Sequence, residues 1–203
     1  SGHLTAGMPP PLRRSASASE GLAIAAFNLG KNDKAREAAK AAISMDAGAW
    51  DARVLLASVL MKGKDYKAAQ EHLEYMVRKE SYNMEYLQQL ATCYLQNNEK
   101  EKLKELDKRI TVLDKSNTES RLRLARAADA SNDIESALTY YKELSILTPK
   151  APDIFRRLSE LSRKKGDMKE SVTFLRRYLD FVTDDAEAHK DLGNLLYEQK
   201  DYD

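Results

Sequence analysis

Histidine, cysteine and the carboxylates are the side chains of this chain that are able to ligate a metal, act as nucleophiles or transfer protons. His3, His72 and His189 are spread over three regions, and the chain contains no HExxH pair, GxSxG elbow or glycine-rich phosphate loop. Cys93 is the only cysteine, so no internal disulfide is expected. Its apolar helical neighbours predict a buried thiol rather than a reactive one. We therefore predict a protein that is not an enzyme, with no catalytic residue, metal site or cofactor.

Carboxylates do recur regularly, at intervals of 34 residues. They are Asp51, Glu85, Glu119, Asp153 and Glu187. We expect each in the first turn of a helix, where the helix dipole favours a negative charge. Helix stabilisation therefore explains this row without a catalytic pair.

Leucine returns at the same interval and indicates the elements that carry these side chains. The row is Leu22, Leu56, Leu90, Leu124, Leu158 and Leu192, and the next residue is always Ala, Ser or Gly. A fixed period of this length is typical of stacked repeats. Within each repeat, apolar residues recur at three- and four-residue steps, which predicts two packed helices of about 14 residues each. We expect the leucines to face the core.

The sequence also encodes the turn between the two helices of a repeat. Gly30, Asn98, Asn132 and Gly166 share one position, where a left-handed backbone ends the first helix. The next residue is an aspartate in four repeats, at positions 65, 133, 167 and 201, which predicts an N-cap for the second helix.

Together these features resemble the tetratricopeptide repeat family. The fourth repeat carries the family's residues at the expected spacings, namely Leu124, Ala125, Ala137, Tyr141, Leu144 and Pro149. The resemblance implies an all-α fold, a right-handed superhelical solenoid of antiparallel helix pairs with about five and a half repeats, and a protein-binding function. Three residues depart from the pattern. Leu103 and Ser171 replace a small alanine and Asp107 replaces an aromatic residue, so we expect less regular packing in the third repeat.

The chain divides into a leader and a repeat domain. Residues 1–15 contain three prolines and no helical period, so we expect a disordered or extended leader, native throughout or beginning with a vector remnant. Repeats start at 16, 50, 84, 118, 152 and 186, and the last, ending at 203, is truncated. Its final helix displays Leu195, Leu196 and Tyr197 with no second helix behind it. We expect either further repeats, a covering partner or self-association through this end.

Charge and hydropathy exclude two classes of partner. Thirty-three Lys and Arg against 32 Asp and Glu give a net charge of +1, which does not favour nucleic acid. The longest mostly apolar stretch, residues 54–61, is far shorter than the roughly 20 residues of a membrane helix, so we expect no membrane insertion. No secretory signal opens the sequence, which favours the cytoplasm over export.

The resemblance also implies that the first helix of each repeat lines a concave partner-binding groove. The early repeats place an apolar set there: Phe27, Met61 and Leu95. The later repeats place a polar, mainly basic set there: Arg123, Arg126, Arg156, Arg157, Arg163, Lys164, Lys190 and Asn194. Guanidinium groups pair well with carboxylates and phosphates, so we expect an acidic or phosphorylated protein segment as partner. Alternatively, these side chains form a solvated face, with Arg126 paired to Glu160, and the apolar set only packs between helices.

The main hypothesis is a non-catalytic scaffold or adaptor, in which charge reversal at Arg123, Arg126 and Arg156 weakens the partner without unfolding the stack. Three alternatives stay open: a regulatory or targeting arm of a larger enzyme, a self-assembling structural module, and a carboxylate clamp for a chaperone tail. The clamp follows from resemblance, because Lys190 and Asn194 match the spacing that opens it. Its remaining ligands require repeats beyond residue 203.

Overall fold

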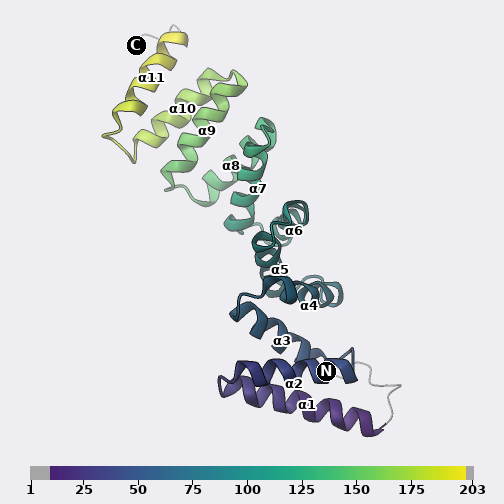
Figure 1. Ribbon diagram of the computed structural model, residues 1–203. Helices are drawn as coiled ribbons and strands as arrows, with labels where there is room; N and C mark the ends of the chain where they lie inside the picture. The colour runs from purple at the N-terminus through teal and green to yellow at the C-terminus, as the bar shows by residue number, and fades with distance from the viewer. Residues whose placement is uncertain (1–9, 200–203) are drawn as a thin grey trace. The chain divides into compact units, whose positions relative to one another are not determined.

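The computed structural model describes residues 10–199, and every regular element in that range is an α-helix. The helices are α1 (Pro10–Asn28), α2 (Asn32–Met45), α3 (Trp50–Lys62), α4 (Tyr66–Lys79), α5 (Met84–Gln96), α6 (Lys100–Leu113), α7 (Thr118–Ala130), α8 (Ile134–Leu147), α9 (Pro152–Lys165), α10 (Met168–Leu179) and α11 (Ala186–Gln199). They are joined by short turns and follow one another as helical hairpins (Figure 1). The chain is an all-α repeat array, as the sequence predicted; the hand of its superhelix stays a prediction.

The helices belong to two compact units, Ser1–Leu103 and Lys104–Asp203, called here the N-terminal and C-terminal units. We call the odd-numbered helices A helices and the even-numbered ones B helices. Within the units an A helix packs against the B helix that follows it, in the pairs α1 with α2, α3 with α4, α7 with α8 and α9 with α10. The B helix in turn packs against the next A helix, as in α2 with α3 and α8 with α9. This alternation lets every hairpin bury its apolar face on a neighbour.

The first helix begins earlier than the sequence predicted. Residues 10–15, expected to be extended, form the start of α1. Prolines are tolerated in the first turn of a helix, because the N–H groups there have no helical acceptor and the fixed φ suits the helix. Residues 1–9 lie outside the described range.

The repeating leucines face the core in the middle of the array. Leu56, Leu90, Leu124 and Leu158 are each at most 3% exposed. Leu192 is half-buried. Leu22 is 62% exposed, so its prediction was wrong. In the described residues no hairpin precedes α1, whereas Leu56 has the α1–α2 hairpin before it, which explains the difference in exposure.

Two of the three residues that depart from the repeat pattern, Asp107 and Ser171, form hydrogen bonds with residues of a neighbouring helix. Asp107 is buried and accepts two hydrogen bonds from the Arg123 guanidinium, at 2.8 and 2.6 Å. Ser171 donates to the carbonyl of Ser159 at 2.9 Å, and the two hydroxyl oxygens lie 3.0 Å apart. Both serines are buried, as Asp107 is. Each pair therefore provides hydrogen bonds to polar groups whose burial without a partner would cost free energy.

The predicted turns are confirmed and extend to one further repeat. Gly30, Asn98, Asn132 and Gly166 have positive φ, and Lys64 adopts the same conformation at the equivalent position. Asp65, Asp133 and Asp167 each accept a hydrogen bond from a backbone N–H in the first turn of the following B helix. Asp201 lies outside the described residues. The predicted acidic row also lies in the first turns of α3, α5, α7, α9 and α11.

Candidate partner-binding face

The basic residues predicted to bind a partner come from three A helices of the C-terminal unit. Arg123 and Arg126 lie one turn apart on α7. On α9, residues 156 and 157 lie two turns before residues 163 and 164, so all four share one side of the helix. Lys190 and Asn194 lie one turn apart on α11. We call the side of α7, α9 and α11 that carries these residues the A-helix face.

Arg123 is committed to contacts within the protein. Its Nη2 and Nε donate to the two carboxylate oxygens of Asp107, and its Nη1 lies 2.5 Å from Glu119 Oε1. Asp107 is only 1% exposed, so this is a buried ion pair. Burial alone lowers the pKa of Arg123, but the bonds to Asp107 and the charge of Glu119 outweigh it and raise the pKa above its usual value.

Arg157 joins two neighbouring A helices. Its Nε and Nη2 donate to Asp129 on α7, at 2.6 and 2.5 Å, and its Nη1 donates to Glu160 on α9 itself. The hydrogen bond to Asp129, followed by that to Glu160, raises the pKa of Arg157 despite partial burial. A bidentate arginine–carboxylate pair of this kind fixes both position and orientation.

Arg156 links α9 to the start of α11. Its Nη1 donates to Asp185 Oδ2 at 2.6 Å, and the Tyr178 hydroxyl donates to the same oxygen at 2.7 Å. Asp185 also accepts from the backbone N–H of Ala188, within the first turn of α11. These bonds, led by that of Ala188, lower the pKa of the Asp185 carboxyl. Arg156 therefore supports the last described helix.

Of the remaining cations of this face, only Arg163 forms an ion pair with another described residue. Arg163 pairs with Glu198 at 3.2 Å, and both side chains are exposed. Arg126, Lys164 and Lys190 are exposed and make no hydrogen bond or ion pair with another described residue. The alternative pairing of Arg126 with Glu160 was wrong, because the bonds of Glu160 go to the arginines of α9.

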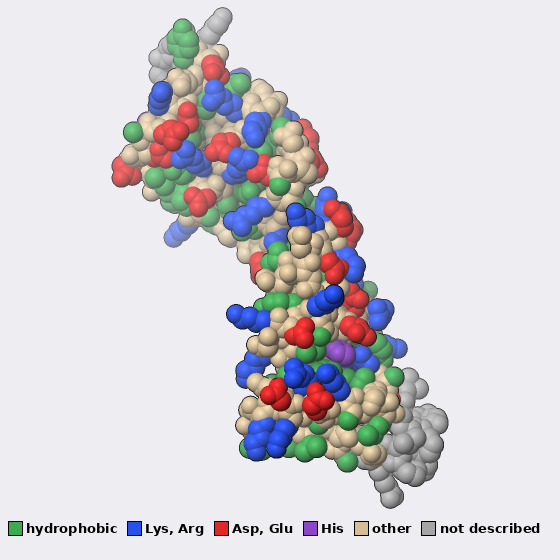
Figure 2. Space-filling view, in the orientation of Figure 1, with side chains coloured by type: hydrophobic (Ala, Val, Ile, Leu, Met, Phe, Trp, Pro, Cys, Tyr) green, Lys and Arg blue, Asp and Glu red, His purple; other side chains and the backbone are tan. Residues whose placement is uncertain are grey.

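The charge of Arg126, like that of the paired Arg157, influences the titration of Tyr141. The buried phenol of Tyr141 has its pKa raised by burial first, and then feels the charges of Asp129, Arg157 and Arg126. Figure 2 shows Lys and Arg intermixed with Asp and Glu over the helices of this unit, rather than a patch of one sign.

The predicted apolar residues belong to the N-terminal unit, whereas the basic set belongs to the C-terminal unit. Phe27 and Met61 are half-buried, and Leu95 is 49% exposed. Met61 Sδ accepts the Cys93 thiol at 3.3 Å, so it packs between α3 and α5. Cys93 is buried, as predicted, and burial raises the pKa of its thiol to about 11. No group of His, Cys, Asp and Glu able to hold a metal occurs among the described residues.

Sequence reasoning missed the carboxylates that neutralise the arginines. The sequence separation of opposite charges could have revealed some of them. Asp129 and Arg157, which form an ion pair, are 28 residues apart. So are Glu74 and Lys102, and so are Lys142 and Glu170. In a 34-residue array this separation places two residues on like helices of successive repeats. Opposite charges at this spacing are therefore expected to meet.

Comparisons with known proteins agree with the helical repeats. A family model described as tetratricopeptide repeat matches residues 20–83 and 122–186, more than half of the chain. The structure is similar to YrrB, described as a TPR protein with an unusual peptide-binding site, with a TM-score of 0.62 at 17% identity over 88% of this chain and 92% of that one. It is also similar to the MamA protein, with a TM-score of 0.61 at 17% identity over 85% and 94% of the two chains. A search of curated proteins gave no match. Likeness at this identity shows the fold alone. No described helix is both long enough and apolar enough to span a bilayer.

Proposed function

This chain belongs to the tetratricopeptide repeat family, and from that premise we propose a non-catalytic scaffold that binds an acidic or phosphorylated protein segment on the A-helix face of its C-terminal unit. The observation that carries the proposal is the set of three exposed cations that pair with no other residue in the range 10–199, namely Arg126, Lys164 and Lys190. They come from three different A helices, so a single extended segment has a cation available on each of them.

The paired arginines support this proposal by holding the face in place. Arg157 and Arg156 are fixed by Asp129 and Asp185, which keeps α7, α9 and the start of α11 together. A binding face whose side chains are already ordered loses less conformational entropy when a partner arrives. The unpaired cations then attract the acidic partner, and the paired arginines hold the helices that carry those cations in position.

A peptide segment is the class of partner that best fits this arrangement. The solved structure of YrrB is described as having a peptide-binding site, which is a property of that protein and supports the same class of ligand here. Carboxylates and phosphates accept charge-assisted hydrogen bonds from arginine and lysine, and such contacts weaken as salt screens the charges.

The test compares two triple charge reversals in the same unit. The first, Arg126→Glu/Lys164→Glu/Lys190→Glu, inverts the free cations of the A-helix face. The matched control, Lys115→Glu/Lys150→Glu/Lys169→Glu, makes the same change in net charge at exposed lysines of the B helices and loops. The probes are a fluorescein-labelled peptide of alternating glutamate and serine, and its phosphoserine form.

We expect the first triple variant to weaken peptide binding by about tenfold or more at low salt, because the steering and pairing charges are inverted. The control should weaken it far less, and raising the salt should weaken wild-type binding. Fluorescence anisotropy measures all three. Equal effects of the two variants, or binding that salt leaves unchanged, would contradict the proposal. Arg123 and Arg156 are left intact, because they hold Asp107 and Asp185.

A further inference from the structure

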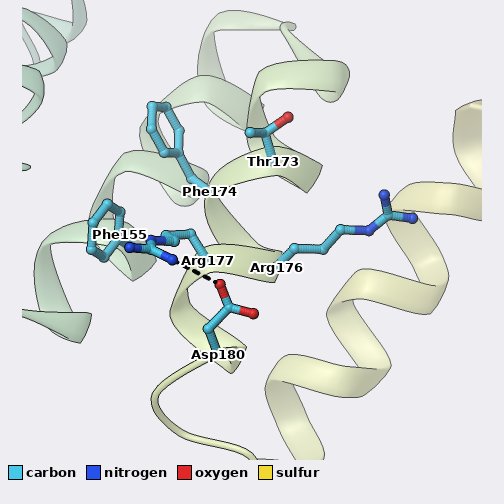
Figure 3. Close-up of a pocket in the computed structure, with 6 residues that line it drawn as sticks. All are labelled: Phe155, Thr173, Phe174, Arg176, Arg177 and Asp180. Carbon is cyan, nitrogen blue, oxygen red and sulfur yellow. Dashed lines mark hydrogen bonds and ion pairs between the residues drawn. The ribbon is translucent and has the colours of Figure 1, made fainter. Parts of the chain in front are cut away.

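The B-helix side of the C-terminal unit carries a shallow pocket of about 330 Å³. Thr173, Arg177 and Asp180 follow one another at steps of four and three residues, and with Arg176, which lies four residues before Asp180, they share one side of α10 and its C-cap. Phe155 of α9 and Phe174 complete the lining (Figure 3). A cavity of this size is at the small end of ligand pockets, so it suits one side chain rather than a whole cofactor.

The aromatic and cationic groups of this pocket are held in place. The rings of Phe155 and Phe181 stack with centroids 6.2 Å apart and planes at 9°. The Arg177 guanidinium lies 5.8 and 5.2 Å from the same two rings and pairs with Asp180 at 3.2 Å. Figure 3 shows Arg177 extending toward Phe155, whereas Arg176 extends the other way, toward the yellow helix α11.

The preceding repeat has a different arrangement at the equivalent positions. There Arg121 takes the place of Phe155 and Glu143 the place of Arg177, and the two form a direct ion pair of 2.9 Å. Arg121 is 8% exposed in its side chain, so that position is closed by its own partner. In the last full repeat the buried ring of Phe155 and the exposed cation of Arg177 replace this ion pair.

Exposed apolar residues continue along the same side of the unit. Val112 and Ile146 occupy the repeat position of Asp180 and are 75% and 78% exposed. The residue after each is also apolar and exposed: Leu113, Leu147 and Phe181. Residues at one repeat position face the same side of a stack. Exposed apolar side chains that recur along one side of a protein are typical of sites of protein association.

We propose that the pocket, together with this apolar row, is a second protein-binding site, separate from the A-helix face. Its ligand is a segment with an aromatic side chain next to a carboxylate. The ring inserts beside Phe155 and Phe174, where offset or edge-on contacts between aromatic rings are favourable. The carboxylate pairs with the guanidinium of Arg177, which extends toward Phe155 and whose exposed pair with Asp180 leaves donor N–H groups available.

The test fills the pocket from an exposed position. Thr173→Trp places an indole over the pocket. Thr139→Trp, exactly one repeat earlier, is the matched control, since both threonines are exposed and each hydroxyl donates to a backbone carbonyl of its own helix at 2.9 Å. The probe is a fluorescein-labelled acidic peptide with one central phenylalanine, and its alanine counterpart is the reference.

In the background of the A-helix-face triple variant, which removes the other proposed site for acidic peptides, we expect Thr173→Trp to weaken binding of the phenylalanine probe by about tenfold. Thr139→Trp should weaken it by less than about twofold, because surface substitutions outside a site have small effects. The alanine counterpart should bind more weakly than the phenylalanine probe. Both variants should melt like the wild type, and the triple variant of the A-helix face should still bind the phenylalanine probe.

Three results would overturn this proposal. They are no binding of the phenylalanine probe at millimolar concentration, equal effects of the two tryptophan variants, and loss of phenylalanine-probe binding in the A-helix-face variant with none in Thr173→Trp. Failure of the A-helix-face proposal is seen separately, with the glutamate–serine peptide.

Discussion

At the scale of single residues, the unusual side chains of this array occur with compensating partners. Asp107 stands where the family pattern has an aromatic residue, and a carboxylate there is costly when buried. Arg123 supplies two hydrogen bonds and the opposite charge from the next A helix. Removing one member of such a pair costs far more than replacing both, because the other charge is left buried alone.

We therefore predict that Arg123→Ala lowers the free energy of unfolding by about 3–5 kcal/mol. The double variant Asp107→Leu/Arg123→Leu should recover most of that loss, because no charge is then left unpaired. Urea denaturation of both variants and of Asp107→Leu completes the cycle. A double variant as unstable as Arg123→Ala would contradict this account.

His72 links stability to pH in the N-terminal unit. Burial first, and then the nearby positive charge of Arg53, lower the pKa of this histidine. Arg53 is buried, donates to the Ala47 carbonyl at 2.7 Å and lies 3.8 Å above the Tyr75 ring. Its Nη1 lies 3.3 Å from His72 Nδ1, so the imidazole accepts only while neutral.

A lowered pKa in the folded state means that the unfolded chain binds the proton first as pH falls. The contribution of His72 is therefore complete above its unfolded value of about 6.5 and is lost as pH falls below it. We predict that unfolding midpoints in urea drop more between pH 7.5 and pH 5.5 for the wild type than for His72→Gln. An equal drop would show that other groups dominate.

At the scale of elements, the turn between paired helices requires a left-handed residue in every full repeat. Glycine or asparagine fills the place four times, but Lys64 does so with φ of 60°. Glycine has no steric cost in this region and asparagine tolerates it, whereas other side chains with a Cβ, such as lysine, are disfavoured there. The α3–α4 hairpin is therefore the one described hairpin of the array with an unfavourable residue at this position.

We predict that Lys64→Gly raises the free energy of unfolding by about 1 kcal/mol. Lys62→Gly, at the end of α3 and still helical, is the control and should lower it by about 0.5–1 kcal/mol. Thermal melting of both variants measures the difference. A Lys64→Gly variant less stable than the wild type would mean that the lysine side chain contributes more than its backbone conformation costs.

At the scale of the whole molecule, stability depends on neighbours, and the leucine row shows where a neighbour is present. Leu56 is 1% exposed and Leu22 is 62% exposed, although they occupy the same repeat position. We predict that Leu56→Ala costs about 2–5 kcal/mol through lost contacts and a cavity. Leu22→Ala should change stability by less than about 0.5 kcal/mol, as exposed substitutions do. Urea titrations of the two variants, compared directly, test this.

The period of the sequence was enough to predict the helices, the turns and most of the core. It predicted burial of Leu124 and Leu158, and the caps at Asp65 and Asp133, because these depend on local conformation and on a fixed register. It failed at Leu22, where exposure depends on what lies beside the helix.

The candidate face was less predictable for a physical reason. A helical period identifies the side of a helix that a side chain occupies, but whether a cation there is free depends on carboxylates of the neighbouring helices. Arg157 and Arg126 look alike in the sequence, yet Asp129 pairs with the first and leaves the second without an ion pair. Charge spacing across repeats carries that information, whereas hydrophobic spacing does not.

The buried position of the single cysteine makes its alkylation rate a measure of how often the surrounding structure opens. Cys93 lies against Met61 in the interior, with its thiol almost wholly protonated at neutral pH. An alkylating reagent attacks the thiolate, so it reacts only during moments when the helices around this sulfur separate. The rate of alkylation, compared with that of the denatured chain, therefore reports how often the N-terminal unit opens, without any introduced label.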